Sequence, residues 1–323
     1  MQMFRGVRMG WRGLRMLPWL LLAWLASCGG GTQQIEPFKP RQIIFIGDET
    51  VGLLPDGRRY GINVLNAANV FDCSQLPIWS QQLASSFGFS TDACSVPGSI
   101  AVTRAVAGAK VADIGAQIDA QITASGGVTN KDLFVVMVGL NDIIDLFENF
   151  PGDRSCDQNN NNPPAGSLMA ELRARGTAVA NQINRVIDLD GRLIVSTVQD
   201  LGYSPYAILR AQTTLLSCMT AVFNARVRVD PVQDGRFWGL VLADDGTAAI
   251  AKNPGSFSVI NTTDGVCTVA PPDCTTSTLV QTTPPAPAAT TNNFLWADDR
   301  HFGPVLHNQL ASAAITRAHN KPF

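Results

Sequence analysis

The chain has 323 residues, of which 46% are hydrophobic and 15% are charged, and it contains 28 glycines and 19 prolines. This composition excludes a wholly disordered or collagen-like chain, and the length suffices for one large α/β domain or two small ones. The formal net charge is −2, and it becomes −6 when the first 27 residues, which hold four arginines and no acidic residue, are set aside. We do not expect an acidic chain of this kind to bind nucleic acid.

The first 27 residues have the features of an export signal. Four arginines precede an apolar run at 17–25, which is too short to span a bilayer as a helix but suits a signal peptide. The run ends in Leu25-Ala26-Ser27-Cys28, which resembles the lipobox of bacterial lipoproteins, in which the cysteine is acylated and becomes the mature N-terminus. An ordinary secretory leader with a chance cysteine is the alternative.

The lipobox resemblance implies a lipid anchor. We expect a signal peptide over 1–27, lipidation at Cys28 and a flexible tether over 28–40. Glycine rather than aspartate follows Cys28, which resembles lipoproteins sorted to the bacterial outer membrane, on its periplasmic or surface side.

Residues 41–323 alternate between strand-like and helix-like segments, which predicts a single α/β domain. In chain order we expect a strand at 42–46, helices at 78–87 and 111–124, a strand at 132–138, a helix at 167–189, a strand at 192–197, and helices at 205–227 and 303–318. Loop inserts are expected at 157–164, which has four consecutive asparagines, and at 275–293, which is rich in threonine, proline and alanine. The alternation favours a mostly parallel sheet with helices on both faces.

Ligand-binding residues of such a sheet lie at the carboxyl ends of its strands. The first predicted strand ends at Gly47-Asp48-Glu49, and the second ends at Gly139-Leu140-Asn141-Asp142. These two strand ends are therefore the places where we expect a site.

Six cysteines remain after Cys28, an even number in a chain expected to reach an oxidising compartment, so three disulfides are predicted. Fifteen pairings are possible. The low cost of closing short loops favours pairing of near neighbours, which are Cys73 with Cys94, Cys156 with Cys218, and Cys267 with Cys274. A zinc site is the rival interpretation, but the chain has no Cys-x-x-Cys, and we expect no metal.

All three histidines lie in the last 23 residues. Asp298 precedes His301 by three positions, a spacing at which a carboxylate can hold one ring nitrogen while the other faces a substrate. The alternative is a surface salt bridge between Arg300 and Asp298 or Asp299, with His301 incidental.

Four motifs occur in the order and at roughly the spacings of the SGNH, or GDSL, hydrolase family. They are Gly47-Asp48, Gly108, Gly139-Leu140-Asn141-Asp142 and Asp298-x-x-His301. Segments 201–205 and 253–261 further resemble GDSL-type esterases related to autotransporter-borne lipases. The resemblance covers nearly the whole mature chain and implies a flavodoxin-like three-layer α/β/α sandwich, the SGNH hydrolase fold.

The resemblance also implies roles for individual residues. It makes His301 the general base and Asp298 the residue that orients it. The backbone N–H of Gly108 and the side-chain amide of Asn141 become donors to a developing oxyanion. Two structural alternatives stand beside these roles: Gly108 permits a tight turn, and Asn141 caps a helix that begins with Asp142.

The chain departs from the family at the nucleophile. The family has Gly-Asp-Ser-Leu where this chain has Gly47-Asp48-Glu49-Thr50. An ion pair with Glu49 would raise the pKa of the His301 imidazole, and a protonated imidazole cannot act as a base. The simplest inference is that serine-esterase turnover is absent while the pocket persists.

Three alternatives remain open at this position. Thr50 could replace the serine as nucleophile, or Glu49 could itself attack while His301 activates water. The oxygens of Asp48, Glu49 and Asn141 could instead hold a cation.

Two hypotheses for the function follow. The first is an active hydrolase of an acyl or carbohydrate ester that works through an atypical site. The second, which we prefer, is a non-catalytic binding protein that keeps the pocket. In either case we expect a monomer without a cofactor, whose partners are a small-molecule or glycan ester and, through the lipid anchor, the membrane.

Overall fold

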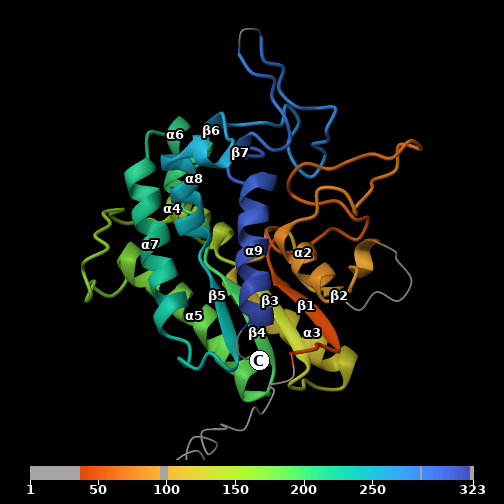
Figure 1. Ribbon diagram of the computed structural model, residues 1–323. Coiled ribbons are helices and arrows are strands. Elements are labelled where there is room, and N and C mark those ends of the chain that lie inside the picture. The colour runs from red at the N-terminus through yellow and green to blue at the C-terminus, as the bar shows by residue number, and fades with distance from the viewer. Residues whose placement is uncertain (1–36, 95–100, 284–285, 321–323) are drawn as a thin grey trace, which may run out of the picture. The chain divides into compact units, whose positions relative to one another are not determined.

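A five-stranded parallel sheet lies at the centre of the computed structural model, which describes residues 37–94, 101–283 and 286–320 (Figure 1). Its strands are β1 (Gln42–Gly47), β2 (Ala101–Thr103), β3 (Asp132–Met137), β4 (Arg192–Ser196) and β5 (Trp238–Val241). They are ordered β2-β1-β3-β4-β5, and every neighbouring pair is parallel. This is the flavodoxin-like order, so the predicted fold class is confirmed.

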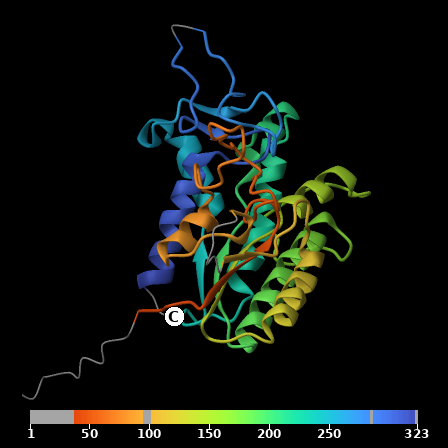
Figure 2. The same ribbon diagram turned by 90° about the vertical axis from the view of Figure 1, so that its right-hand side faces the viewer.

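Helices cover both faces of the sheet (Figure 2). One face packs against α3 (Ile114–Ser125), α4 (Leu140–Asn149), α5 (Leu168–Asp188) and α7 (Thr213–Val229). The other face packs against α2 (Trp79–Ser86), α8 (Ala243–Lys252) and α9 (Pro304–Asn320). Successive residues of β1 alternate between the two cores, since Ile44 and Ile46 face the first and Ile43 and Phe45 face the second. Burial on both faces explains why the strand is apolar throughout.

A smaller sheet lies beyond the carboxyl ends of the central strands. It pairs β6 (Asn261–Gly265) with β7 (Phe294–Trp296). The chain passes from β7 into the segment 297–303 and then into α9. The described residues of both predicted loop inserts lie outside the helices and named strands.

Several predicted elements differ from those observed. The single helix predicted over 205–227 is wrong, because Ala211 has a left-handed φ of 55° and separates α6 (Pro205–Leu209) from α7. The helix after β3 begins at Leu140 rather than at Asp142, with Gly139 at its N-cap, so Asn141 lies in the first turn and is not the cap. The strands β2 and β5 and the helix α8 were not predicted.

The three predicted disulfides are present. Their Cα–Cα separations are 5.8, 6.1 and 5.8 Å, within the usual range. They join Cys73 to Cys94, Cys156 to Cys218 and Cys267 to Cys274.

The expected signal peptide, Cys28 and most of the tether lie outside the described residues. Within the part of the chain that the structure describes, no helix combines the length and hydrophobicity needed to cross a membrane.

Candidate active site

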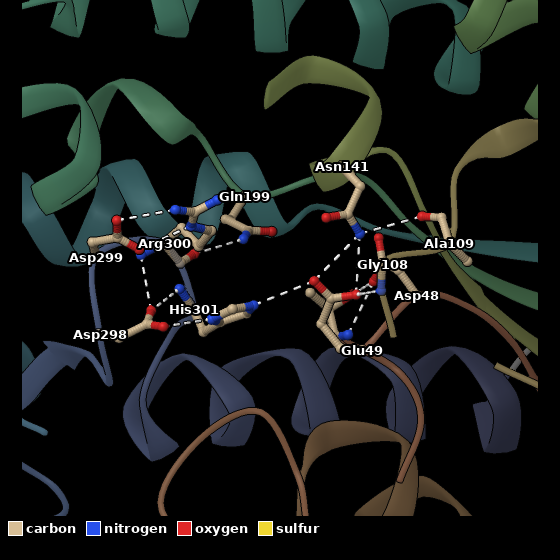
Figure 3. A network of polar contacts seen from close by, with 11 residues as sticks. Asp48, Glu49, Gly108, Ala109, Asn141, Gln199, Asp298, Asp299, Arg300 and His301 are labelled. Carbon is tan, nitrogen blue, oxygen red and sulfur yellow. Dashed lines mark hydrogen bonds and ion pairs between the residues drawn. The ribbon is translucent and has the colours of Figure 1, made fainter. Parts of the chain in front are cut away.

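Groups from four distant segments meet at the carboxyl end of the sheet (Figure 3). Glu49 follows β1, Gly108 follows β2, and Asn141 lies in the first turn of α4 after β3. Asp298 and His301 come from the segment between β7 and α9, and His301 is 252 positions from Glu49. The parallel strands bring these segments together because their carboxyl ends share one edge.

Two glycines allow the turns that present Glu49 and Asn141. Gly47 has a φ of 136°, and a Cβ there would lie 1.8 Å from the carbonyl oxygen of Met137. Gly139 has a φ of 126°, and a Cβ there would lie 2.5 Å from the Phe223 ring. Only glycine fits either position, which explains the glycine that opens each strand-end motif.

Gln117 of α3 holds the turn after β1 in place. Its Oε1 accepts a hydrogen bond from the Gly47 N–H at 2.7 Å, and its Nε2 donates to the Gly47 carbonyl at 2.9 Å. The sequence does not single out this residue, since nothing in a helical pattern distinguishes one inward-facing glutamine from another.

The Asp298 carboxylate orders the segment that carries His301. Its Oδ1 accepts from the backbone N–H groups of Arg300 at 2.9 Å and of His301 at 2.6 Å, and its Oδ2 lies 2.7 Å from His301 Nδ1. Arg300 pairs instead with Asp299 at 2.8 Å. His301 is 7% exposed, so it is a buried member of the site and not an incidental neighbour of a surface salt bridge.

The Glu49 carboxylate lies on the groups expected to bind an oxyanion. Its Oε2 accepts from the Gly108 N–H at 2.8 Å and from Asn141 Nδ2 at 3.0 Å. Its Oε1 lies 3.3 Å from His301 Nε2, and Figure 3 shows the imidazole between Asp298 and Glu49. A carboxylate therefore occupies the position at which the resemblance places the oxyanion of a tetrahedral intermediate.

The electrostatics of the site favour a charged imidazole. Burial alone would lower the pKa of His301, but the hydrogen bonds and negative charges of Asp298 and Glu49 outweigh it and raise the pKa to about 9. Burial alone would raise the pKa of Glu49. The hydrogen bond and positive charge of His301, together with the hydrogen bond from the Gly108 N–H, outweigh burial and lower the pKa of Glu49. At neutral pH the pair is an imidazolium facing a carboxylate.

Thr50 does not face the imidazole. Its hydroxyl donates to Asp48 Oδ1, and its backbone N–H donates to the same oxygen at 2.9 Å. Asp48 is fully buried, and burial together with the charge of Glu49 raises its pKa to about 8. The Thr50 hydroxyl is therefore bound to Asp48 and not to His301, the base that the resemblance implies.

The other two histidines lie elsewhere. The Trp79 N–H donates to His307 Nδ1 at 3.3 Å, and burial, with the charges of Arg59 and His301, lowers the pKa of His307 to about 3. His319 stacks on Phe87. Among the described residues, no three side chains of histidine, cysteine, aspartate or glutamate gather closely enough to hold a metal ion.

Two cavities meet at Glu49, which lines both. The first, of about 470 Å³, lies between residues 52–55 and 103–107 and includes Tyr60 in its wall. The second, of about 890 Å³, is lined by Asn141, Asp298, Arg300 and His301 and by the segments beyond the sheet. Both volumes lie in the range of small-molecule sites.

No protein-family model and no curated protein sequence matches the chain. Several solved structures are similar to it at low identity. Axe2, an acetylxylan esterase from Geobacillus stearothermophilus, is 14% identical, over 87% of this chain and 95% of that one, with a TM-score of 0.40. A member of the lipolytic G-D-S-L family from Veillonella parvula is 10% identical, over 85% and 96%, with a TM-score of 0.41. The acetyl xylan esterase AlAXEase is 11% identical, over 84% and 96%, with a TM-score of 0.45.

Proposed function

We propose that this chain is an exported lipoprotein of SGNH-hydrolase descent in which Glu49 has converted an ester-hydrolase site into a non-catalytic binding site. The observation that carries the proposal is the position of the Glu49 carboxylate, which accepts from Gly108 and Asn141 and pairs with His301.

With Glu49 in the site, three requirements of serine-dependent ester hydrolysis are not met. The serine hydroxyl is absent, the imidazole is protonated by its ion pair, and the oxyanion donors are bound to a permanent anion. Removing a single oxyanion donor already costs about 100- to 1,000-fold in turnover, so loss of both donors together with the base leaves little activity.

Direct attack by Glu49 is the competing chemistry. A carboxylate nucleophile would need one free oxygen and a second group of donors for the substrate oxyanion. Here Gly108 and Asn141, which would stabilise that oxyanion, both donate to Glu49. The arrangement therefore favours binding over covalent catalysis.

The rest of the site is retained. Asp298 still holds His301 at 2.7 Å, and the cavities on both sides of Glu49 are open to small molecules. A site that keeps its shape without its nucleophile is suited to bind an ester or a related molecule and release it unchanged.

Glu49→Ser tests the proposal, with short-chain aryl esters as substrates for the purified protein. We expect wild type and Glu49→Gln to stay at the background rate and Glu49→Ser to rise above it, because serine breaks the ion pair and frees the oxyanion donors. The gain in hydrolysis rate is limited, since a misplacement of the catalytic groups by about 1 Å lowers the rate roughly a hundredfold. The double variant Glu49→Ser/His301→Ala should return to background. Brisk hydrolysis by wild type that Glu49→Gln abolishes would make Glu49 a working catalytic group and overturn the proposal.

A further inference from the structure

A tyrosine ring lies beside the imidazole of His301. The ring centroids of Tyr60 and His301 are 5.3 Å apart, and the two rings are tilted by 50°. Both nitrogens of the imidazole already have carboxylate partners, Nδ1 in Asp298 and Nε2 in Glu49. Tyr60 therefore adds a contact with the ring of an imidazole whose nitrogens are already held.

The tyrosine ring stands between the imidazole and the first cavity. Tyr60 lines this cavity of about 470 Å³, whereas His301 lines the second cavity and not the first. His301 is 7% exposed, and Tyr60 is half-buried. Water or a ligand in the first cavity therefore meets the phenol ring before it can reach the imidazole.

The residue before Tyr60 fixes the loop that carries it. Arg59 is 2% exposed, and its guanidinium donates to the backbone carbonyls of Gln75, at 2.6 Å, and of Leu76. Its backbone N–H donates to Asn63 Oδ1 at 3.1 Å, and Asn63 Nδ2 donates to the Arg59 carbonyl at 3.1 Å. Buried polar groups with these partners hold a loop in one conformation, because breaking their bonds costs the desolvation of each group.

Exclusion of water strengthens the ion pair of the site. Charges attract more strongly as the local dielectric constant falls. The hydrogen bonds and charges of Asp298 and Glu49 outweigh burial and raise the pKa of His301 to about 9, and Asp48 and His307 are the other titratable groups that sense the charge of His301. Water beside the imidazole would screen the two carboxylates and bring the pKa of His301 back toward its ordinary value of 6.5.

We propose that Tyr60 is a positioning residue of this site, whose ring separates the imidazole of His301 from the first cavity and keeps water away from the His301–Glu49 pair. The inference deepens the proposed function and rests on it, because this ion pair is what deprives the site of a base. It also makes the two cavities separate compartments that meet at Glu49, which lines both.

NMR titration of the His301 ring protons between pH 5 and 10.5 tests the role of Tyr60, with His301→Ala to assign the signals. We expect a midpoint at about pH 9 for wild type and for Tyr60→Phe, which keeps the ring, and a midpoint about one pH unit lower for Tyr60→Ala. Burial raises the pKa of Tyr60 above its ordinary value, so the phenol stays neutral over most of this range. Tyr203→Ala is the matched control, since Tyr203 is also half-buried but lines a different cavity, and it should leave the midpoint unchanged.

Thermal unfolding shows whether each variant is folded, and Tyr60→Leu takes the place of Tyr60→Ala if the alanine variant is not. A merely structural role would lower the melting temperature of Tyr60→Ala without moving the midpoint of His301. Two results would overturn the inference: a folded Tyr60→Ala that titrates like wild type, or a fall in Tyr60→Phe as large as that in Tyr60→Ala. Hydrolysis of aryl esters by wild type would refute the proposed function instead, and the titrations would still decide the role of Tyr60.

Discussion

At the scale of single residues, the length of the Glu49 side chain matters as much as its charge. A serine hydroxyl stays close to the backbone, where it can attack a bound ester, whereas the glutamate carboxylate extends two bonds further and reaches Gly108 and Asn141. The presence of a glutamate at this strand end and its effect on the His301 pKa can be inferred from sequence. The hydrogen bonds that its carboxylate accepts from Gly108 and Asn141 cannot be inferred, because they depend on the rotamer that the buried surroundings of Glu49 select.

The ion pair predicts how stability depends on pH. The pKa of His301 is raised from 6.5 to about 9 in the folded protein. Its contribution to the free energy of unfolding is therefore fully present below about pH 6.5 and is lost as pH rises through about 9. Glu49→Gln removes one of the two carboxylates that stabilise the protonated imidazole of His301. The free energy of unfolding of this variant should therefore fall less steeply with pH over this range than that of wild type. Urea unfolding between pH 6 and 10 measures the two slopes, and equal slopes would show that Glu49 and His301 do not pair.

At the scale of elements, the site depends on strand ends and on the helix that secures one of them. The apolar runs of β1, β3 and β4 are recognisable in the sequence because both of their faces are buried. The strands β2 and β5 have three and four residues, too few for a pattern to emerge, and their positions follow from pairing with neighbours. The break at Ala211 escaped prediction because alanine is a strong helix former, so local propensity favours the opposite of what the fold requires there.

Gln117 provides a test at this scale. Gln117→Ala removes both hydrogen bonds to Gly47 and leaves a buried N–H unpaired, which should lower the free energy of unfolding by about 1–3 kcal/mol. Thr123→Ala, exposed on the same helix, should change it by less than about 0.5 kcal/mol. The difference in urea midpoint between the two variants measures the effect. If Gln117→Ala were as stable as the Thr123 variant, the turn would not depend on this contact.

At the scale of the whole molecule, the layered sheet and the disulfides could be predicted from the order of the elements along the chain and from the spacing of the cysteines. Near-neighbour pairing anticipated all three disulfides, and the alternation of strands and helices anticipated the layered sheet. The two cavities beside Glu49 were not predictable, because loops far apart in sequence form their walls.

The proposed lipid anchor is tested at the scale of the whole molecule. Cys28→Ser should move the protein from the membrane fraction to a soluble or unprocessed pool, because acylation at this cysteine is the proposed link to the membrane. Fractionation of cells that express each form, followed by immunoblotting, measures the shift. Unchanged, detergent-extractable membrane association of Cys28→Ser would argue for a different mode of attachment.

The central claim is that Glu49 alone separates this site from a working serine hydrolase. A single measurement tests it most directly: the intact mass of wild type and of Glu49→Ser after treatment with an activated alkyl phosphonate, which reacts once with a serine that has a base and oxyanion donors beside it. We predict one phosphonyl adduct on Glu49→Ser, absent from wild type and from Glu49→Ser/His301→Ala. An unmodified Glu49→Ser that is fully folded would contradict the account, because the remaining groups would then not form a hydrolase site.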